Sequence, residues 1–271
     1  MVVQHNLKAM NSNRMLGLTN ATQAKSTEKL SSGYKINRAA DDAAGLAISE
    51  KMRRQVRGLT QAAANAQDGV SMVQTAEGAL NEVHDMLQRM NELATKAANG
   101  TLTSTDRGYV QSEVNQLISE INRTADDTTF NEKNLLKSNQ TISLQVGTES
   151  GNIINLNLSK MKASGIGITD SNCKVSTDTG ARTALGTIKS AIASVSTFRS
   201  ELGAVQNRLE HTINNLNNVV ENTTSAESSI HDTDMATEMV KYSNNNILAQ
   251  AGQAMLAQAN QSNQGVLSLL G

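Results

Sequence analysis

Apolar residues recur along the first half of the chain with the spacing of a helix that packs against another helix. From Met52 to Ala94 they follow steps of four and three residues, with Glu77, His84 and Asn91 at the skipped positions, a heptad pattern sustained for about six repeats. Its members are Met52, Val56, Leu59, Ala63, Ala66, Val70, Val73, Leu80, Leu87 and Ala94. The pattern predicts one helix over residues 42–98, about 85 Å long, which Asn99 and Gly100 end with a left-handed stop.

A second seam of the same kind occupies the last third of the chain. Its apolar members are Leu185, Ile188, Ile192, Val195, Leu202, Leu209, Ile213, Leu216 and Val220. Arg199 and Gln206 stand at seam positions, and the two long seams are predicted to pack against each other. A shorter helix beginning near Thr105 carries a stripe that includes Val110 and Val114, and it is predicted to fold back antiparallel across "NGTLTS".

The hydrophobic period changes to two between residues 140 and 158. Apolar and polar residues alternate in "TISLQVG" and "NIINLNLS", and "TESGN" separates them, which predicts a β-hairpin. Residues 159–180 are rich in Ser, Thr, Gly and Asp without a clear period, so a short variable surface segment is expected there. The predicted fold class is mainly α: long antiparallel helices in a coiled-coil-like rod with one β-hairpin.

The two ends of the chain carry thin apolar stripes. Their members are Val3, Leu7, Met10, Ala21 and Ala24 at the start, and Leu248, Ala251, Met255, Ala259, Val266 and Leu269 at the end. Such stripes bury too little apolar surface to order an isolated helix. We therefore expect a middle domain, residues 41–224, that folds alone, and terminal helices, residues 1–40 and 225–271, that pair and become ordered on assembly.

Composition supports long helices and limits the possible chemistry. The 271 residues include two Phe, three Tyr, no Trp and no Pro, so a bulky globular core is not expected and only glycine and turn residues end helices. No apolar run approaches a membrane span or a signal-peptide centre, and by these signals alone the protein is soluble and cytosolic. A net charge of −1 gives no general reason to bind nucleic acid or an acidic membrane.

Charge is distributed unevenly along the chain. Residues 1–60 hold ten Lys and Arg against four acids, whereas residues 221–271 hold five acids and one base, Lys241. Either the basic end binds phosphate or the two ends lie near each other, and the interleaved apolar residues favour the second interpretation. The run "EKMRRQVR" likewise fits an anionic surface or, more commonly, solvated and intersubunit ion pairs.

Catalytic and metal-binding patterns are missing from the sequence. The histidines His5, His84, His211 and His231 stand singly, and no zinc-protease motif of two His with a Glu occurs. Cys173 is the single cysteine, so the chain forms no internal disulfide; the thiol is either exposed and prone to oxidation or a small residue in a turn. We therefore expect neither an enzyme nor a cofactor.

The adjacent acids of "SSGYKINRAADDAAGLAIS" raise a choice between chemistry and architecture. Neighbouring helical residues point about 100° apart, so Asp41 and Asp42 cannot flank one substrate bond as paired acids. Residues from Asn37 to Asp42 are instead predicted to start the long helix, where carboxylates meet exposed N–H groups. Gly33 breaks the backbone before this motif, and Gly45 with its alanine neighbours allows another helix to approach closely.

The stretch "KLSSGYKINRAADDAAGLAISEKMR" resembles the N-terminal signature of bacterial flagellins. So do "GVSMVQTAEGALNEVHDMLQRMNELATKAANGT", "INRTADDTTFNEKNLL" and the C-terminal "ANQSNQGVLSLLG". The resemblance implies a structural protein that is exported unfolded through the flagellar type III apparatus and polymerises beneath a cap into the swimming filament. It implies extracellular localisation without a cleaved signal peptide, which overrules the cytosolic expectation.

The resemblance also implies an arrangement and partners. The terminal segments of flagellins pair in an α-helical inner tube, here with contacts at Leu248, Ala251, Met255 and Leu269, and the middle forms a rod. The short segment 159–180 replaces the large outer domains of many members, so the chain resembles a minimal flagellin. Implied partners are further copies of the chain, an export chaperone, and the cap and hook-junction proteins.

Flagellins also resemble one another in a surface recognised by the innate receptor Toll-like receptor 5. The stretches "QRMNELATKAANG" and "VQSEVNQL" place Gln88, Arg89, Leu93 and Glu113 at receptor-contact positions. Arg89 and Leu93 are four residues apart on one helical face, and Glu113 lies near them if the next helix folds back. The alternative is that these are exposed charges beside an ordinary rod residue.

Two other classes share part of this pattern. The junction protein between hook and filament shares the terminal signatures, but "QRMNELA" and the final "SLLG" favour the filament subunit. A secreted coiled-coil adhesin or effector shares only the properties needed for export, and electron microscopy of sheared surface filaments separates it from a repeating subunit.

Overall fold

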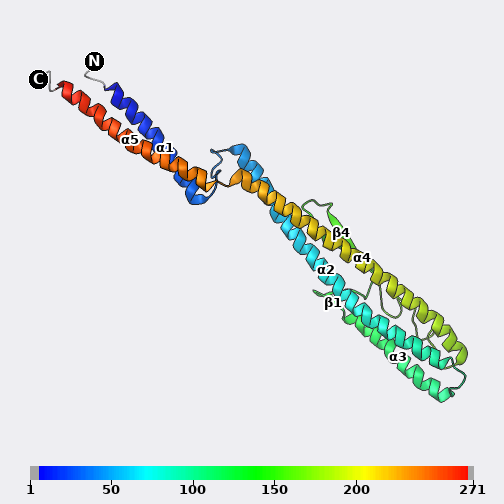
Figure 1. Cartoon of the computed structure of the whole chain (residues 1–271). Helices are drawn as coiled ribbons and strands as arrows, with labels where there is room; N and C mark the ends of the chain where they lie inside the picture. The colour runs from blue at the N-terminus through cyan, green and yellow to red at the C-terminus, as the bar shows by residue number, and fades with distance from the viewer. Residues whose placement is uncertain (1–5, 268–271) are drawn as a thin grey trace. The chain divides into compact units, whose positions relative to one another are not determined.

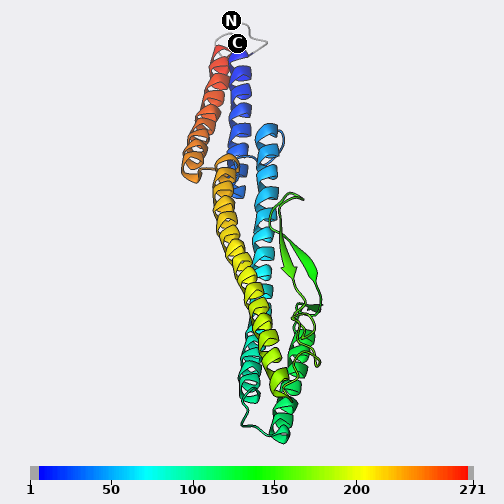
Figure 2. The ribbon, with the colours of Figure 1, turned by 90° about the vertical axis from the view of Figure 1, so that its right-hand side faces the viewer.

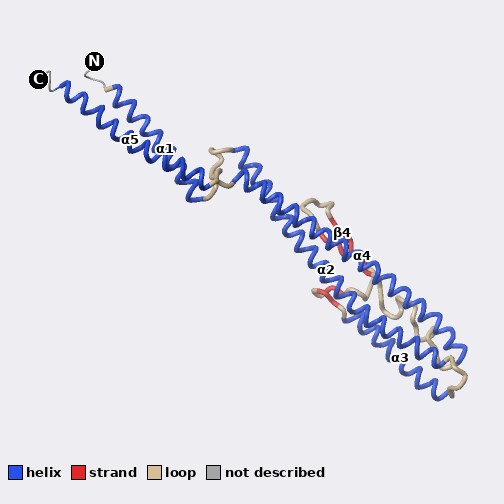
Figure 3. Tube along the Cα trace, in the orientation of Figure 1, coloured by secondary structure: helices blue, strands red, loops and turns tan. Residues whose placement is uncertain are grey.

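The fold is described from a computed structural model, which covers residues 6–267, with side chains to residue 262. Its helices are α1 (Leu7–Ser32), α2 (Ala43–Ala97), α3 (Ser104–Asp127), α4 (Asp178–His231) and α5 (Met235–Leu267) (Figure 1). Its strands are β1 (Thr129–Phe130), β2 (Lys133–Asn134), β3 (Gln140–Gln145) and β4 (Ile153–Leu158). Helices dominate the Cα trace, so the predicted mainly-α class is confirmed (Figure 3).

The chain divides into two compact units. A terminal unit comprises Met1–Val56 and Glu221–Gly271, and a central unit comprises Arg57–Val220. The long helices α2 and α4 each contribute to both units. The division therefore falls within continuous helices. Of the boundaries expected from the sequence, the one near residue 40 lies in the break between α1 and α2, whereas the one near residue 225 lies inside α4.

The core of the central unit lies along the two predicted seams. Fully buried side chains come from α2, α3 and α4 and form one continuous cluster, which includes Leu80, Leu87, Val114, Ile121, Ile188 and Leu202. A smaller cluster joins Ala66 and Val70 of α2 to Leu209 of α4. Burial of this kind stabilises by roughly 1.5–3 kcal/mol per large side chain, so the seams supply most of the free energy that holds the helices together.

One pair of polar seam residues links the two long helices. Arg199 of α4 places Nη2 3.6 Å from Oε1 of Glu77 on α2. Both side chains are partly shielded from water. A half-buried charge that loses its partner is costly, so this pair favours one register of α4 along α2 over registers shifted by a heptad.

The predicted hairpin is confirmed, and a second, smaller one accompanies it. Strand β3 pairs antiparallel with β4, and the alternate side chains Ile154, Leu156 and Leu158 are buried. Strands β1 and β2 form the extra hairpin around Asn131 and Glu132, whose φ angles of 46° and 65° are left-handed. The sequence analysis missed this second hairpin because its turn is made without the glycine that usually marks one.

Residues 159–180 are not a simple surface segment, and this corrects the expectation for them. Their apolar side chains are buried in the core of the central unit: Met161, Ala163, Ile166, Ile168, Cys173 and Val175. The Cys173 thiol is fully buried, which settles its two interpretations against exposure. Desolvation raises its pKa to about 11, so the thiol stays protonated at neutral pH.

Two amide side chains of α3 hold this irregular segment in place. Gln111 donates to the carbonyl of Cys173 (3.3 Å) and accepts from the backbone N–H of Val175 (2.6 Å). Asn122, three turns further along the same face, accepts from the N–H of Ala163 (3.1 Å). The side chains thereby satisfy backbone groups that no sheet or helix would pair.

In the terminal unit, α1 and α5 lie side by side, as both ribbon views show (Figure 2). Gly252 of α5 packs closely against α1, since an added Cβ would lie 3.2 Å from Leu16 Cδ1. The expected pairing of the terminal helices is confirmed. No helix in the described part of the chain is long and apolar enough to cross a membrane.

We expect Gln111→Ala to lower the free energy of unfolding by about 1–3 kcal/mol, because it leaves two buried backbone groups without partners. Urea unfolding followed by circular dichroism measures the change. Ser112→Ala, an exposed neighbour on α3, is the control and should change stability by less than about 0.5 kcal/mol. Equal stability of both variants would show that the segment is held by its apolar contacts alone.

Candidate functional site

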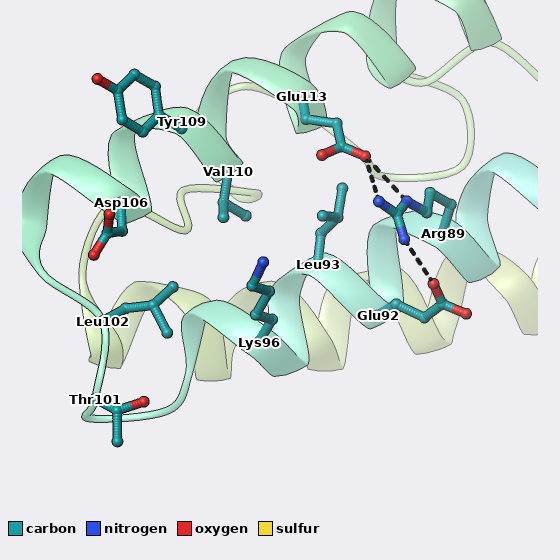
Figure 4. A pocket seen from close by; sticks show the side chains of 10 residues that line it. All are labelled: Arg89, Glu92, Leu93, Lys96, Thr101, Leu102, Asp106, Tyr109, Val110 and Glu113. Atoms are coloured by element: carbon teal, nitrogen blue, oxygen red, sulfur yellow. Dashed lines mark hydrogen bonds and ion pairs between the residues drawn. The ribbon is translucent and has the colours of Figure 1, made fainter.

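A charged cluster connects α2 to α3 in the central unit. The guanidinium of Arg89 donates from Nε and Nη2 to Oε1 of Glu113, at 3.0 and 2.8 Å, and from Nη1 to Oε2 of Glu92 at 3.1 Å (Figure 4). These hydrogen bonds, that to Glu113 first, raise the pKa of Arg89 above its ordinary value. The guanidinium is thus held in one orientation by two carboxylates while half of its side chain remains exposed.

The other two candidate receptor residues differ in exposure. Gln88 is exposed, and its Nε2 lies 3.4 Å from Nε2 of His84 one turn earlier. Leu93 is only 3% exposed and points into the space between the two helices (Figure 4). Leu93 shares a helical face with Arg89, as the spacing predicts, but most of its surface is buried in packing.

A pocket of about 550 Å³ extends from this cluster to the connection between α2 and α3. Its lining residues are Arg89, Glu92, Leu93, Lys96, Thr101, Leu102, Asp106, Tyr109, Val110 and Glu113 (Figure 4). The walls carry charges of both signs around a small apolar floor. Tyr109 leaves 73% of its surface exposed at the rim, so a large aromatic face is available to a partner.

The far wall of the pocket is fixed by a capping box at the start of α3. The Thr103 hydroxyl accepts from the N–H of Asp106 (3.2 Å), and Oδ2 of Asp106 accepts from the N–H and the hydroxyl of Thr103 at 3.1 and 2.7 Å. These bonds to Thr103, aided by the charge of Lys96, lower the pKa of Asp106. The helix start predicted near Thr105 is thus confirmed to within a residue, and Thr103 is its N-cap.

The helix-start motif is architectural in every member. Gly33 ends α1 in the left-handed conformation (φ 78°). Asp41 accepts from the N–H groups of Asn37 (3.3 Å) and Arg38 (3.0 Å), and Asp42 accepts from the N–H of Gly45 (2.9 Å). Residues 37–42 thus form a turn before α2 rather than its first residues, because their N–H groups bond to Asp side chains instead of to a preceding helical turn.

The Gly45 position also shows why a small residue stands there. A Cβ added to it would lie 2.5 Å from Oδ2 of Asp42 and 2.7 Å from Cδ1 of Ile36, which is buried. The motif is therefore closely packed on both sides. Its two acids are committed to backbone N–H groups and are not available as a catalytic pair.

Within the terminal unit, the segment between α1 and α2 contacts the segment between α4 and α5. Lys35 N–H donates to the carbonyl of His231 (2.8 Å), and Thr233 N–H donates to the carbonyl of Gly33 (2.9 Å). The rings of Tyr34 and His231 pack with centroids 4.2 Å apart. Two backbone hydrogen bonds and one ring contact thus hold the connections at residues 33 and 232 together.

The paired terminal helices have an unusual distribution of bulky side chains. The inward positions of α1 include Ser12, Leu16, Thr19, Gln23 and Ser26, and those of α5 include Glu238, Tyr242, Asn245, Ala249 and Gly252. Large apolar residues face outward: Leu7, Met10, Met15 and Leu18 on α1, and Met239, Val240, Ile247, Leu248 and Met255 on α5, all more than half exposed. The pair of helices α1 and α5 therefore exposes its large apolar side chains on its outer surface.

The candidate assembly residues belong to that outward surface. Leu248 and Met255 are 57% and 62% exposed, and Ala251 between them is exposed as well. Steps of three and four residues place all three on one face of α5. Leu269 lies outside the described residues.

No group of His, Cys, Asp and Glu in the described part of the chain is arranged to hold a metal ion. The two candidate surfaces are a charged pocket between α2 and α3 and an exposed apolar face on the α1–α5 pair. Together they define a class of long helical proteins whose paired terminal helices leave an apolar face exposed.

Comparison with known proteins gives the family within this class. The helical regions of bacterial flagellin match at both ends, the N-terminal region over residues 3–141 and the C-terminal region over residues 185–270. The chain belongs to the bacterial flagellin family and is a structural subunit of the flagellar filament. It is 52% identical to a flagellin of Halalkalibacterium halodurans and 45% identical to one of Bacillus subtilis, each alignment covering both chains completely.

Solved structures agree with the family. Bacillus cereus flagellin is 29% identical with a TM-score of 0.50, and the match covers 56% of this chain and 88% of that one. A putative flagellar hook-associated protein from Vibrio parahaemolyticus has a TM-score of 0.61 at 14% identity, covering 71% of this chain and all of the other. That second likeness shows the fold alone, so the identities favour a filament subunit over a junction protein.

We expect Thr103→Ala to destabilise the start of α3, by about 1 kcal/mol for a lost N-cap, and to raise the pKa of Asp106 towards its usual 3.8. Since Asp106 has a lowered pKa in the folded state, its contribution to stability is present above 3.8 and is lost as pH falls through the lowered value. A carboxyl NMR titration measures the shift. Thr101→Ala, in the same connection, should leave the Asp106 titration unchanged.

Proposed function

We propose that this flagellin polymerises through the outward apolar faces of α1 and α5, and that residues 1–40 and 225–271 become ordered there as the inner tube of the filament. One observation carries the proposal. Most of the bulky apolar residues of α1 and α5 point outward, and most of the positions between the two helices are small or polar. Full burial of a Leu or Met side chain contributes roughly 1.5–3 kcal/mol. Copies of the chain that cover these faces therefore supply stability that one copy lacks.

The extracellular setting and the accessory partners form part of the same proposal. Relatives that match along their whole length include a flagellar filament 33 kDa core protein of Treponema phagedenis, which is 46% identical. A filament of this kind requires export of each subunit and attachment to the hook. We therefore infer secretion, with an export chaperone, a cap and hook-junction proteins as partners, and no enzymatic activity.

A second function, recognition by Toll-like receptor 5, is supported by the cluster around Arg89. Its guanidinium is oriented before any partner arrives, since Glu92 and Glu113 hold it through three hydrogen bonds. Preorganisation of this kind lowers the entropy lost on binding. Gln88 adds an exposed amide beside it, and Leu93 contributes by supporting the two charged side chains from below.

For assembly, we expect Leu248→Ser with Met255→Ser to raise the critical concentration for elongation of filament seeds at least tenfold, since about 1.4 kcal/mol of lost contact energy suffices. Sedimentation of filaments measures it. The control is Gln253→Ser with Asn260→Ser, two exposed polar positions at the same spacing, which should assemble like the unmodified chain. Unchanged assembly of the first variant would contradict the proposal.

Ordering of the ends has its own test, in hydrogen exchange of monomer and filament. Amides of α1 and α5 should exchange rapidly in dilute monomer and become protected in filaments, because neighbours bury the outward faces. Chains lacking residues 1–35 or 240–271 should remain soluble and folded in the central unit without polymerising. Protected terminal amides in the monomer, or filaments from a truncated chain, would overturn the proposal.

For the receptor, we expect Arg89→Ala and Glu113→Ala each to weaken binding to the Toll-like receptor 5 ectodomain by about tenfold or more, as for a central interface residue. Surface plasmon resonance measures the affinity. Arg123→Ala is a matched control, because Arg123 on α3 is likewise exposed and held by two carboxylates, Glu120 and Asp127. An equal loss in all three variants would indicate a general effect of charge and not a receptor site.

A further inference from the structure

The outward face of α1 contains two cations within its apolar stripe. Its members are Leu7, Met10, Arg14, Leu18, Ala21 and Lys25, in steps of three, four, four, three and four residues. These steps keep all six on one side of the helix. Arg14 and Lys25 are eleven residues apart, which corresponds to about three turns and about 16 Å.

Neither cation has a carboxylate partner in the described part of the chain. Arg14 donates from Nη2 to the side-chain oxygen of Asn11 (3.2 Å), which is neutral. The carboxylate of α1 itself, Glu28, is bound to Arg38 at 2.9 Å. Both cations are exposed; Lys25 lines one pocket with Asp41 and Asp42 and another with Glu238, without an ion pair to any of the three.

Assembly removes that water if the stripe is covered as proposed above. An unpaired cation buried among apolar side chains costs more free energy than the neighbouring apolar contacts contribute. The stripe can thus be covered only by a surface that brings two carboxylates at matching positions. In a filament of identical subunits, that surface belongs to another copy of the chain.

Most carboxylates of the terminal unit are already engaged. Those with partners are Glu28 (Arg38), Asp41 (two N–H groups), Asp42 (Gly45 N–H), Glu50 and Glu227 (Arg53), Asp234 (the start of α5) and Glu238 (Lys241). Glu221 is exposed and makes no ion pair within the described residues. Asp232 is 43% exposed, and its Oδ1 lies 3.5 Å from Nδ1 of His231.

These two remaining acids have the spacing of the two cations. Glu221 and Asp232 are eleven residues apart, and the N–H of Asp232 still donates to the carbonyl of Ser228 (2.8 Å), so the helical geometry of α4 reaches it. The acidic pair therefore also spans about 16 Å on one face. Parallel and antiparallel alignments both allow two ion pairs to form at once.

We propose that Arg14 and Lys25 of one copy bind Glu221 and Asp232 of a neighbouring copy in the filament. The inference rests on the proposed assembly through α1. Between the two acids the same face of α4 carries Ser225 and Ser228, so apolar contact does not set the alignment of the two helices. The paired charges select the register in which both cations face carboxylates.

Two charge-reversal variants test the contact in trans. Arg14→Glu with Lys25→Glu makes both surfaces of the contact acidic, and Glu221→Lys with Asp232→Lys makes both basic. Each variant alone should raise the critical concentration for seeded elongation by about tenfold or more at low salt. An equimolar mixture should return to within about threefold of the unmodified chain, because each reversed surface then meets an opposite one, and the rescue should fade as salt rises.

A matched reversal off the stripe controls for net charge. Lys51→Glu with Arg54→Glu changes the charge equally on α2, and mixing it with the basic-reversed variant should not restore assembly. Circular dichroism and urea unfolding of each monomer check that the fold persists. Because Asp232 lies beside His231, Glu221→Lys alone provides a milder acidic-side variant with the same expected partner.

Several outcomes would overturn the inference. Normal assembly of either double variant alone, or a mixture that assembles no better than its components, rejects the pairing. A defect confined to the Arg14 and Lys25 variant would mean that a different anion covers the stripe. If Leu248→Ser with Met255→Ser also assembles normally, the proposed assembly route itself has failed; if that variant fails while the charge variants assemble, only this pairing has.

Discussion

The position of bulky apolar side chains relative to the helix partner determines which part of this flagellin is complete in one copy. In the central unit Leu80, Leu87 and Leu202 are buried between helices. In the terminal unit most of the corresponding inward positions hold small or polar residues such as Gln23 and Asn245, and most of the large apolar side chains lie outside. The same helical geometry therefore produces a closed core in one unit and an apolar outer surface in the other.

In both units, charged residues within apolar seams favour one alignment of the helices over others. Between α2 and α4, Glu77 and Arg199 pair at seam positions, and a heptad shift would leave each without its partner. Apolar heptads alone tolerate such shifts because one Leu replaces another. The outward stripe of α1 repeats this logic with Arg14 and Lys25, so polar residues in an apolar seam carry the register both within the chain and, by our proposal, between copies.

Sequence periodicity predicted the elements whose stability depends on a single repeated face. The heptads of α2 and α4 and the alternation of β3 and β4 were readable for this reason. Residues 159–180 were not, since their burial depends on Gln111 and Asn122, polar residues whose spacing on α3 resembles that of any exposed face. The turn at residues 131 and 132 escaped prediction because a non-glycine pair adopts the left-handed conformation there.

The candidate site was only partly accessible from the sequence. Resemblance to flagellins located Gln88, Arg89, Leu93 and Glu113, and helical spacing explained why Arg89 and Leu93 share a face. Neither could show that Glu92 completes the clamp around Arg89 or that Leu93 is nearly buried, because both depend on how α3 folds back over α2. Long-range packing of this kind has no local pattern.

The two candidate surfaces depend on different sources of stability. Arg89 and Glu113 stand on the central unit, whose core is closed by side chains of the same chain, so their geometry does not require a polymer. Leu248 and Met255 stand on the outward face of the α1–α5 pair, whose geometry, by our proposal, is fixed when neighbouring copies cover it. A receptor that binds the surface around Arg89 can therefore recognise a single released subunit. By our proposal, a protein that binds the outward face of α5 must do so before that subunit enters the filament.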